Sequence, residues 1–116
     1  METLELHDAL VVGVDTNGKE LRLRLERVSV YEGDRLVRQE GGVLRLEDVH
    51  DSRVDGLVAT LRLELEYGRV LDWALDNGAG RLLIEWVGDS PPRRQLSDWT
   101  FRLRAHAWGP ALHHAD

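Results

Sequence analysis

The residues best suited to chemistry are two His-Asp dipeptides, His7-Asp8 and His50-Asp51. A histidine beside a carboxylate can be oriented and kept basic, which general-base catalysis and metal ligation both require. Adjacent residues of a strand point to opposite faces, so neither dipeptide is expected to form a pair by itself. An enzyme would therefore draw on His7, Asp8, His50 and Asp51 together. The alternative is structural: His7 and Asp8 shape the start of the first strand, and Asp8 bonds to nearby backbone amides.

Other chemical motifs are incomplete. His50, Asp51 and Ser52 are the residue types of a hydrolytic triad, but three consecutive residues cannot adopt triad geometry. Asp48, Asp51 and Asp55 lack the spacing and the closing glutamate of a calcium-binding loop. The chain contains neither a phosphate-binding loop nor a dinucleotide fingerprint. The sequence therefore predicts no catalytic residue, no resident metal and no cofactor.

The four tryptophans are the other notable side chains: Trp73, Trp86, Trp99 and Trp108. At least two of them are expected to fill the core, because each lies in the apolar phase of an expected strand. Trp99 follows a polar loop and Trp108 precedes Gly109-Pro110. Either ring is thus a candidate anchor for a partner at the rim of the domain.

The elements that must position these residues are strands. Residues 21–28 read Leu-Arg-Leu-Arg-Leu-Glu-Arg-Val, with an apolar side chain at every second position until Leu25. The same alternation returns in residues 44–47, 61–66 and 101–104. Alternation with a period of two gives a strand one apolar and one charged face, whereas a helix would spread the leucines around its girth. The sequence therefore predicts a one-sided sheet.

Seven or eight strands follow from this pattern. Residues 9–15 and 20–31 are expected to form a hairpin, since Asn17-Gly18 accepts the positive φ of a tight turn. Residues 69–76 suit a strand better than a two-turn helix, because a strand there completes a hairpin with residues 81–87. The remaining expected strands are 36–39, 43–49, 57–67 and 99–108, with loops at 50–56 and 88–98.

An all-β fold follows, either an antiparallel β-sandwich or a partly closed barrel. We expect a single β domain over residues 1–110 and a flexible C-terminal tail over residues 111–116. His113, His114 and Asp116 lie on that tail, where a dedicated metal site is not expected.

The composition limits the partners. The 116 residues include 15 basic and 21 acidic side chains, a net charge of −6, and no cysteine. The negative charge argues against a nucleic-acid partner and favours a basic protein surface. No apolar run approaches the length of a membrane span, and the acidic N-terminus does not resemble a signal peptide. We therefore expect a cytoplasmic protein that binds neither membrane nor nucleic acid.

Leu6-His7-Asp8-Ala9, followed by a short valine-rich strand, a turn and an alternating strand, resembles the opening of small, uncharacterised bacterial β-rich proteins. These proteins carry a Leu-His-Asp signature near the N-terminus, and some are grouped with the immunity proteins of bacterial toxin systems. The resemblance covers about the first quarter of the chain. It implies a compact β fold with no known activity and names no catalytic residue.

Together these observations predict a small, non-catalytic binding module, immunity-like in its sharpest form, that engages a basic protein partner. Three alternatives remain open. The chain could be a hydrolase or metal-dependent enzyme that uses the His-Asp residues. It could be a structural protein that self-associates, for example as a homodimer, through a sheet edge or a tryptophan patch. It could also be a barrel that holds a small apolar ligand.

Overall fold

The computed structural model describes residues 1–76 and 78–110, and these form ten strands and no helix. The strands are β1 (Glu2–Glu5), β2 (Leu10–Asn17), β3 (Glu20–Glu32), β4 (Arg35–Glu47), β5 (His50–Val54), β6 (Leu57–Val58), β7 (Tyr67–Asp76), β8 (Ala79–Asp89), β9 (Pro92–Arg102) and β10 (Ala105–Pro110). All pairings are antiparallel. The predicted all-β antiparallel class is confirmed, with ten strands in place of seven or eight.

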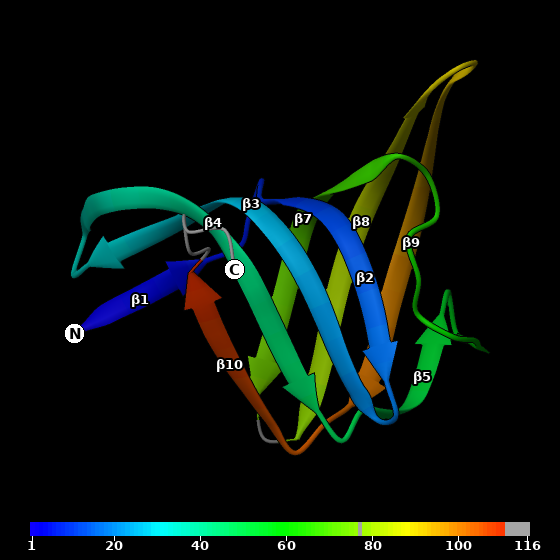
Figure 1. Cartoon of the computed structure of the whole chain (residues 1–116), viewed down its shortest axis with the longest axis horizontal. Coiled ribbons are helices and arrows are strands. Elements are labelled where there is room, and N and C mark those ends of the chain that lie inside the picture. The colour runs from blue at the N-terminus through cyan, green and yellow to red at the C-terminus, as the bar shows by residue number, and fades with distance from the viewer. Residues whose placement is uncertain (77, 111–116) are drawn as a thin grey trace.

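The strands form one sheet in the order β10-β4-β3-β2-β7-β8-β9-β5-β6, and β1 pairs with β3 outside this path. β2 meets β7 through only two residue pairs, Leu10 with Arg69 and Val11 with Gly68. The sheet divides at this short ladder into one half built from β1–β4 and β10 and another built from β5–β9 (Figure 1). β10 and β6 end the path without pairing to each other, so the sheet is not closed into a barrel.

The core lies between the two halves. Leu21, Leu23 and Leu25 of β3 are at most 1% exposed, and Ile84 and Trp86 of β8 are fully buried. These side chains belong to one hydrophobic cluster, to which both halves contribute. The charged residues between them are exposed or half-buried, as the alternation predicts. Burial of the alternate leucines is therefore what holds the two halves together.

A bulge in β3 changes which of its residues face the core. Buried positions fall on odd numbers up to Leu25 and include Val28 and Val30 after it, and the register with β4 shifts between Leu25 and Val28. Beyond the bulge, β3 pairs with β1 on one side and with the first half of β4 on the other. We call this three-stranded extension the flap: residues 2–5, 28–32 and 35–40. The flap projects from the body of the molecule (Figure 1).

The predicted break at Gly41-Gly42 is wrong, because β4 runs through both glycines. A Cβ atom at residue 42 would lie 2.3 Å from the backbone oxygen of Gly109 and 2.8 Å from the Cα of Pro110. Gly42 thus permits the close approach of β10 to β4 rather than ending a strand.

The region between β4 and β7 also differs from the prediction. Residues 50–54 form β5 in place of the expected loop. Of the expected 57–67 strand, only Leu57–Val58, as β6, and Tyr67, the first residue of β7, lie in the sheet. The chain must pass from β6, at one end of the sheet, to β7 in its middle, so residues 59–66 cannot stay paired with the edge. Leu61 nevertheless enters the core at 2% exposure, whereas Leu63 is 37% exposed. The leucine alternation of this segment therefore predicts burial only in part.

The end of the chain is divided differently from the prediction. β8 and β9 continue into the expected 88–98 connection and form a long hairpin, with Asp89 paired to Pro92 around its tip. Pro91 and Pro92 therefore sit at a turn and a strand start, where a missing N–H costs little. The predicted 99–108 strand is two strands, since the chain leaves β8 after Arg102 and pairs with β4 from Ala105.

The remaining local predictions are confirmed. β2 and β3 form the expected hairpin, and Gly18 has a φ of 65° in its turn. The pairing of β2 with β3 carries a register shift between Val11 and Gly13. β7 is a strand rather than a helix and pairs with β8. Among residues 1–76 and 78–110, the structure has no helix that could cross a membrane.

Candidate functional site

The turn between β1 and β2 carries the first His-Asp dipeptide and fastens it to the other half of the sheet. Leu6 and Ala9 are buried, whereas His7 and Asp8 between them are exposed. The amide of Asp8 donates to the carbonyl of Val70 at 2.8 Å, and the amide of Val70 donates to Ala9 at 2.9 Å. The turn is therefore held rigidly next to β7.

His7 and Asp8 do form a pair, contrary to the expectation that they would point to opposite faces. The Nδ1 of His7 lies 3.1 Å from the Oδ2 of Asp8. Asp8 has a φ of 68°, so it is not in an extended conformation and the alternation of a strand does not apply. The structure places the two side chains in a tight turn, which is closed by a hydrogen bond from the amide of Ala9 to the carbonyl of Leu6 at 2.9 Å.

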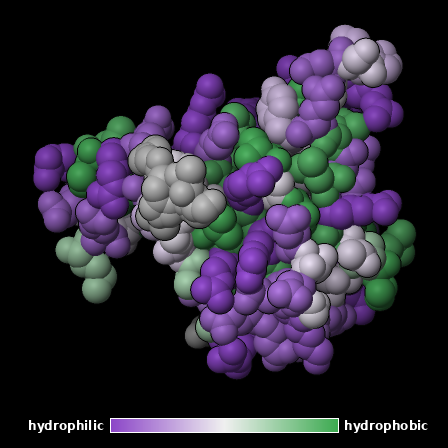
Figure 2. All heavy atoms as spheres, in the orientation of Figure 1, coloured by the Kyte–Doolittle hydropathy of each residue, from purple (hydrophilic) through white to green (hydrophobic). Residues whose placement is uncertain are grey.

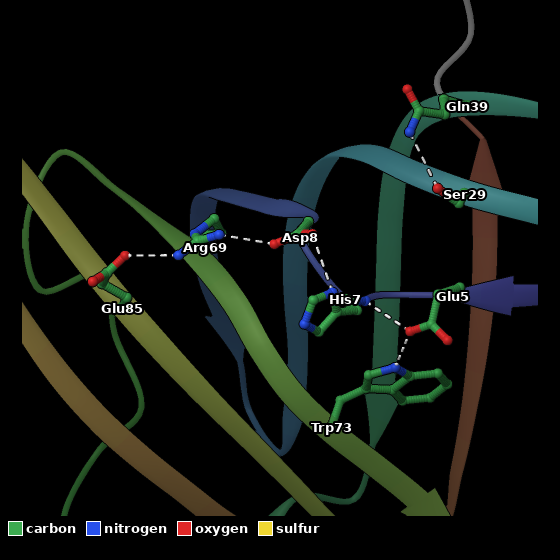
Figure 3. A network of polar contacts seen from close by, with 8 residues as sticks. All are labelled: Glu5, His7, Asp8, Ser29, Gln39, Arg69, Trp73 and Glu85. Carbon is green, nitrogen blue, oxygen red and sulfur yellow. Dashed lines mark hydrogen bonds and ion pairs between the residues drawn. The ribbon is translucent and has the colours of Figure 1, made fainter.

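The pair continues into a chain of charges (Figure 3). Asp8 accepts a hydrogen bond from Nη1 of Arg69 at 2.9 Å, and Nη2 of Arg69 donates to Glu85 at 3.2 Å. The carboxylate of Asp8 thus binds side chains in place of the backbone amides that the sequence suggested. These contacts are exposed, so each contributes about 0–1 kcal/mol to stability. Their main effect is to fix the carboxylate that orients His7.

Glu5 is fixed in a similar way. Its Oε1 atom accepts the backbone amide of His7 at 2.8 Å and the indole Nε1–H of Trp73 at 2.7 Å. Figure 3 shows the carboxylate between the two donors. Glu5 therefore links β1 to β7 and is already hydrogen-bonded within the protein.

A polar cavity of about 460 Å³ opens beside this turn, where the flap joins the body. We call it the His7 cavity. The cross-strand register explains its floor, because Glu5 pairs with Ser29 and Ser29 with Gln39, so the three side chains share one face of the flap. The amide of Gln39 donates to the Oγ of Ser29 at 3.2 Å. The cavity is lined by Glu5, His7, Asp8, Arg27, Ser29, Tyr31 and Gln39.

Arg27 reaches the cavity from the β3 bulge. Its φ is 61°, in the left-handed region that glycine prefers. No hydrogen bond or ion pair joins Arg27 to another of the described residues. A bulge commonly redirects a side chain toward a site. Here it brings to the wall of a cavity a guanidinium that has no partner among residues 1–76 and 78–110.

The second His-Asp dipeptide lies elsewhere. His50 and Asp51 are in β5, which β7, β8 and β9 separate from β2 in the sheet. The Nδ1 of His50 lies 2.8 Å from the carbonyl oxygen of Asp48, and the carboxylate of Asp51 lies 3.4 Å from Arg53. Neither residue lines the His7 cavity. The structure therefore does not bring His7, Asp8, His50 and Asp51 together in that cavity.

The neighbours of His50 have structural partners. The hydroxyl of Ser52 donates to the carbonyl of Ala59 at 2.8 Å. The Oδ1 atom of Asp55 accepts the amide of Asp98 at 2.9 Å. Among the described residues, no group of three or more His, Asp or Glu side chains could hold a metal ion. His113, His114 and Asp116 lie outside the described residues.

The two tryptophans expected at a rim differ in placement. Trp99 is fully buried and stacks obliquely on Trp86, with ring centroids 5.7 Å apart, so it does not form an exposed anchor. Its strand begins earlier than expected, which places Trp99 in the interior rather than after a loop. Trp108 is half-buried, and its Nε1–H donates to Glu40 at 2.7 Å. This hydrogen bond, with that from Arg38, lowers the pKa of Glu40 below its ordinary value.

Sequence reasoning missed the residues that complete the cavity: Glu5, Arg27, Ser29, Tyr31 and Gln39. One signal was present, since the apolar phase of β3 changes between Leu25 and Val28. A phase change indicates a bulge, and a bulge marks its residues as candidates. The pairing of β1 with β3 had no such signal.

Comparison of the chain with protein-family models, with curated proteins and with solved structures found no match in any of the three.

Proposed function

We propose that this protein is a non-catalytic binding module for a polypeptide partner, and that the partner contacts the flap around the His7 cavity. The observation that carries the proposal is the continuity of this face. Tyr31, on the cavity wall, is the direct cross-strand neighbour of Leu36, which is 50% exposed. A polar depression beside exposed apolar groups has the composition of a protein interface.

The flap is accessible and carries exposed apolar side chains. It projects from the body, and hydrophobic atoms show on it in Figure 2. Val37, next to Leu36, is 38% exposed. Apolar side chains on a projecting strand pair can be covered by a partner without rearrangement of the core.

The net charge of −6 favours a basic partner. Charge of one sign steers an oppositely charged protein toward the complex and accelerates association, while raised salt weakens the effect. In its sharpest form the module is immunity-like: it masks the basic surface of another protein in the cytoplasm.

A matched pair of variants tests the proposal. Leu36→Asp places a charge on the flap, and Leu57→Asp does the same on β6, where Leu57 is 74% exposed. Each protein is immobilised, and bound proteins are compared at low and high salt. We expect a basic protein that is retained by the wild type and by Leu57→Asp but not by Leu36→Asp, and that salt releases. Equal retention by all three proteins, or retention by none, would reject the proposal.

A second candidate function rests on the His7–Asp8 contact of 3.1 Å. A carboxylate that orients an imidazole is half of a general-base apparatus, and water could serve as the nucleophile. Among the described residues, no hydrogen bond or ion pair joins the His7 side chain to a hydroxyl group. The test is hydrolysis of chromogenic esters and phosphoesters. Activity in the wild type that His7→Gln removes would favour an enzyme over a binding module.

A further inference from the structure

The groups of the His7 cavity that remain unused within the protein are mostly hydrogen-bond donors. Glu5 accepts two N–H groups, and Asp8 is held by Arg69 and His7. Both acids that line the cavity therefore already have polar partners within the protein.

Three side chains on the flap side have hydrogen-bond donors that no acceptor of the described residues uses. The guanidinium of Arg27 has no partner among the described residues. The Oγ of Ser29 accepts from Gln39, so its own O–H remains available. The Tyr31 O–H makes no hydrogen bond within the described part of the chain. These three donors together match a ligand group that offers only acceptors.

His7 contributes the complementary group. Its Nδ1 lies 3.1 Å from the carboxylate of Asp8, which in its ionised form only accepts, so the tautomer with the proton on Nδ1 fits this contact. The Nε2 atom of the neutral ring is then an acceptor, able to receive one N–H from a ligand.

We propose that the His7 cavity binds a carboxylate group carried by a polypeptide. Arg27 donates to it as a two-pronged guanidinium, Tyr31 and Ser29 add their hydroxyl protons, and Nε2 of His7 receives the peptide N–H beside the carboxylate. Arg is suited to this role because its planar fork matches a carboxylate. The cavity volume of about 460 Å³ is within the range of small-ligand sites.

This inference deepens the proposed function and rests on it. The carboxylate can come from the C-terminus of a chain or from a Glu or Asp side chain. An N–H immediately beside the carboxylate favours the C-terminus, since the terminal residue carries both groups on one Cα.

The conformation of Arg27 permits a clean test. A left-handed φ of 61° is costly for arginine and free of cost for glycine. Arg27→Gly therefore removes the guanidinium without straining the bulge, and Arg27→Asn does so with a residue that tolerates the same φ. Arg24→Gln is the matched control, because Arg24 is exposed on the same strand and does not line the cavity.

The experiment is an NMR titration of the full ¹⁵N-labelled chain with three peptides. The first is acetyl-Lys-Ala-Leu with a free C-terminal carboxylate, the second is the same peptide amidated, and the third is amidated acetyl-Lys-Glu-Leu. We expect the free acid to shift the amides of Arg27, Ser29 and Tyr31 and to bind about tenfold more tightly than the amidated form. Arg27→Gly and Arg27→Asn should lose this preference while unfolding at the same or a higher temperature, and Arg24→Gln should keep it.

Each other outcome has a defined meaning. If amidated acetyl-Lys-Glu-Leu binds more tightly than the free acid and the amidated Ala peptide does not bind, the carboxylate site stands and its source is a side chain. Equal binding of all three peptides, no shift with any of them, or full binding by Arg27→Gly would overturn the carboxylate site. The proposed function would survive that result if Leu36→Asp still abolished partner retention.

Discussion

Among the described residues, the non-glycine positions with left-handed backbone are four aspartates and one arginine. Five such residues occur in the described chain: Asp8, Arg27, Asp48, Asp51 and Asp55. Aspartate tolerates this conformation, because its short polar side chain can hydrogen-bond locally. Arginine has no such compensation, so Arg27 is the one position where the backbone is strained for the sake of a long side chain. This strain is the residue-scale argument that the cavity has a use.

Ser97 gives a stability prediction at the same scale. Its Oγ is fully buried and has no hydrogen-bond partner in the described structure. Removing an unsatisfied hydroxyl costs little, so Ser97→Ala should leave the free energy of unfolding unchanged or raise it by up to about 1 kcal/mol. Ser29→Ala, which removes the acceptor of Gln39, should lower it by about 0.5–1 kcal/mol. Urea unfolding measures both, and a clear loss in Ser97→Ala would show that its hydroxyl has a partner.

Trp108 and Glu40 predict a pH dependence. The Trp108 hydrogen bond is the main cause of the lowered pKa of Glu40, whose ordinary value is 4.5. A carboxyl with a lower pKa in the folded state stabilises the fold above pH 4.5, and this contribution disappears as the pH falls through the lowered pKa. Trp108→Phe should cost about 1–2 kcal/mol at neutral pH, and the difference from the wild type should shrink in acid.

Denaturant unfolding across this pH range is the measurement. A difference between the two proteins that stays constant with pH would mean that the Glu40 contact contributes nothing to stability.

At the scale of elements, the sequence predicted strands well and their ends poorly. In β3 and β8 the alternation predicts which side chains are buried, because successive side chains of a strand point to opposite faces. Where pattern and pairing separate, the prediction fails: residues 61–66 alternate like a strand yet lie outside the sheet. The sequence predicts a break at Gly41-Gly42, but β10 is what requires a glycine at residue 42. That contact is long-range, so no local pattern shows it. Of the candidate site, the sequence identified His7 and Asp8 but not the residues that β3 and β4 bring to them.

Gly42→Ala tests the close approach of β10. A methyl group at residue 42 would collide with backbone atoms of Gly109 and Pro110, which cannot rotate away. We expect a loss of about 1–3 kcal/mol and faster amide hydrogen exchange across β10. Gly109→Ala, where the nearest atom is 3.9 Å from the added carbon, should have little effect. Equal exchange rates in the two variants would contradict the prediction.

At the scale of the whole molecule, two half-sheets share one core but only a two-residue ladder. The two halves are held together by burial of side chains at the junction more than by backbone hydrogen bonds. The net charge of −6 is likewise a property of the whole chain, which the sequence alone gives. The order of the strands was beyond sequence reasoning, because it is decided by contacts between distant residues.

Gly68→Ala tests the junction. An added Cβ would lie 2.5 Å from Ile84 and 2.7 Å from Trp86, both fully buried. We expect a loss of about 2–4 kcal/mol in a single cooperative transition, because the two halves cannot unfold separately around one core. Gly88→Ala meets only ordinary contacts with Leu65, 3.6 Å away, and serves as the control. Two separate thermal transitions would show that the halves are independent.

The position of β10 has a consequence for biosynthesis. β10 is the last strand described, yet it pairs with β4, more than fifty residues earlier. During translation, the backbone groups of residues 42–47 that face β10 have no strand partner until residues 105–110 have been synthesised. A nascent polypeptide arrested before residue 105 would offer that strand to other molecules, so chaperone contact during synthesis should concentrate on β4.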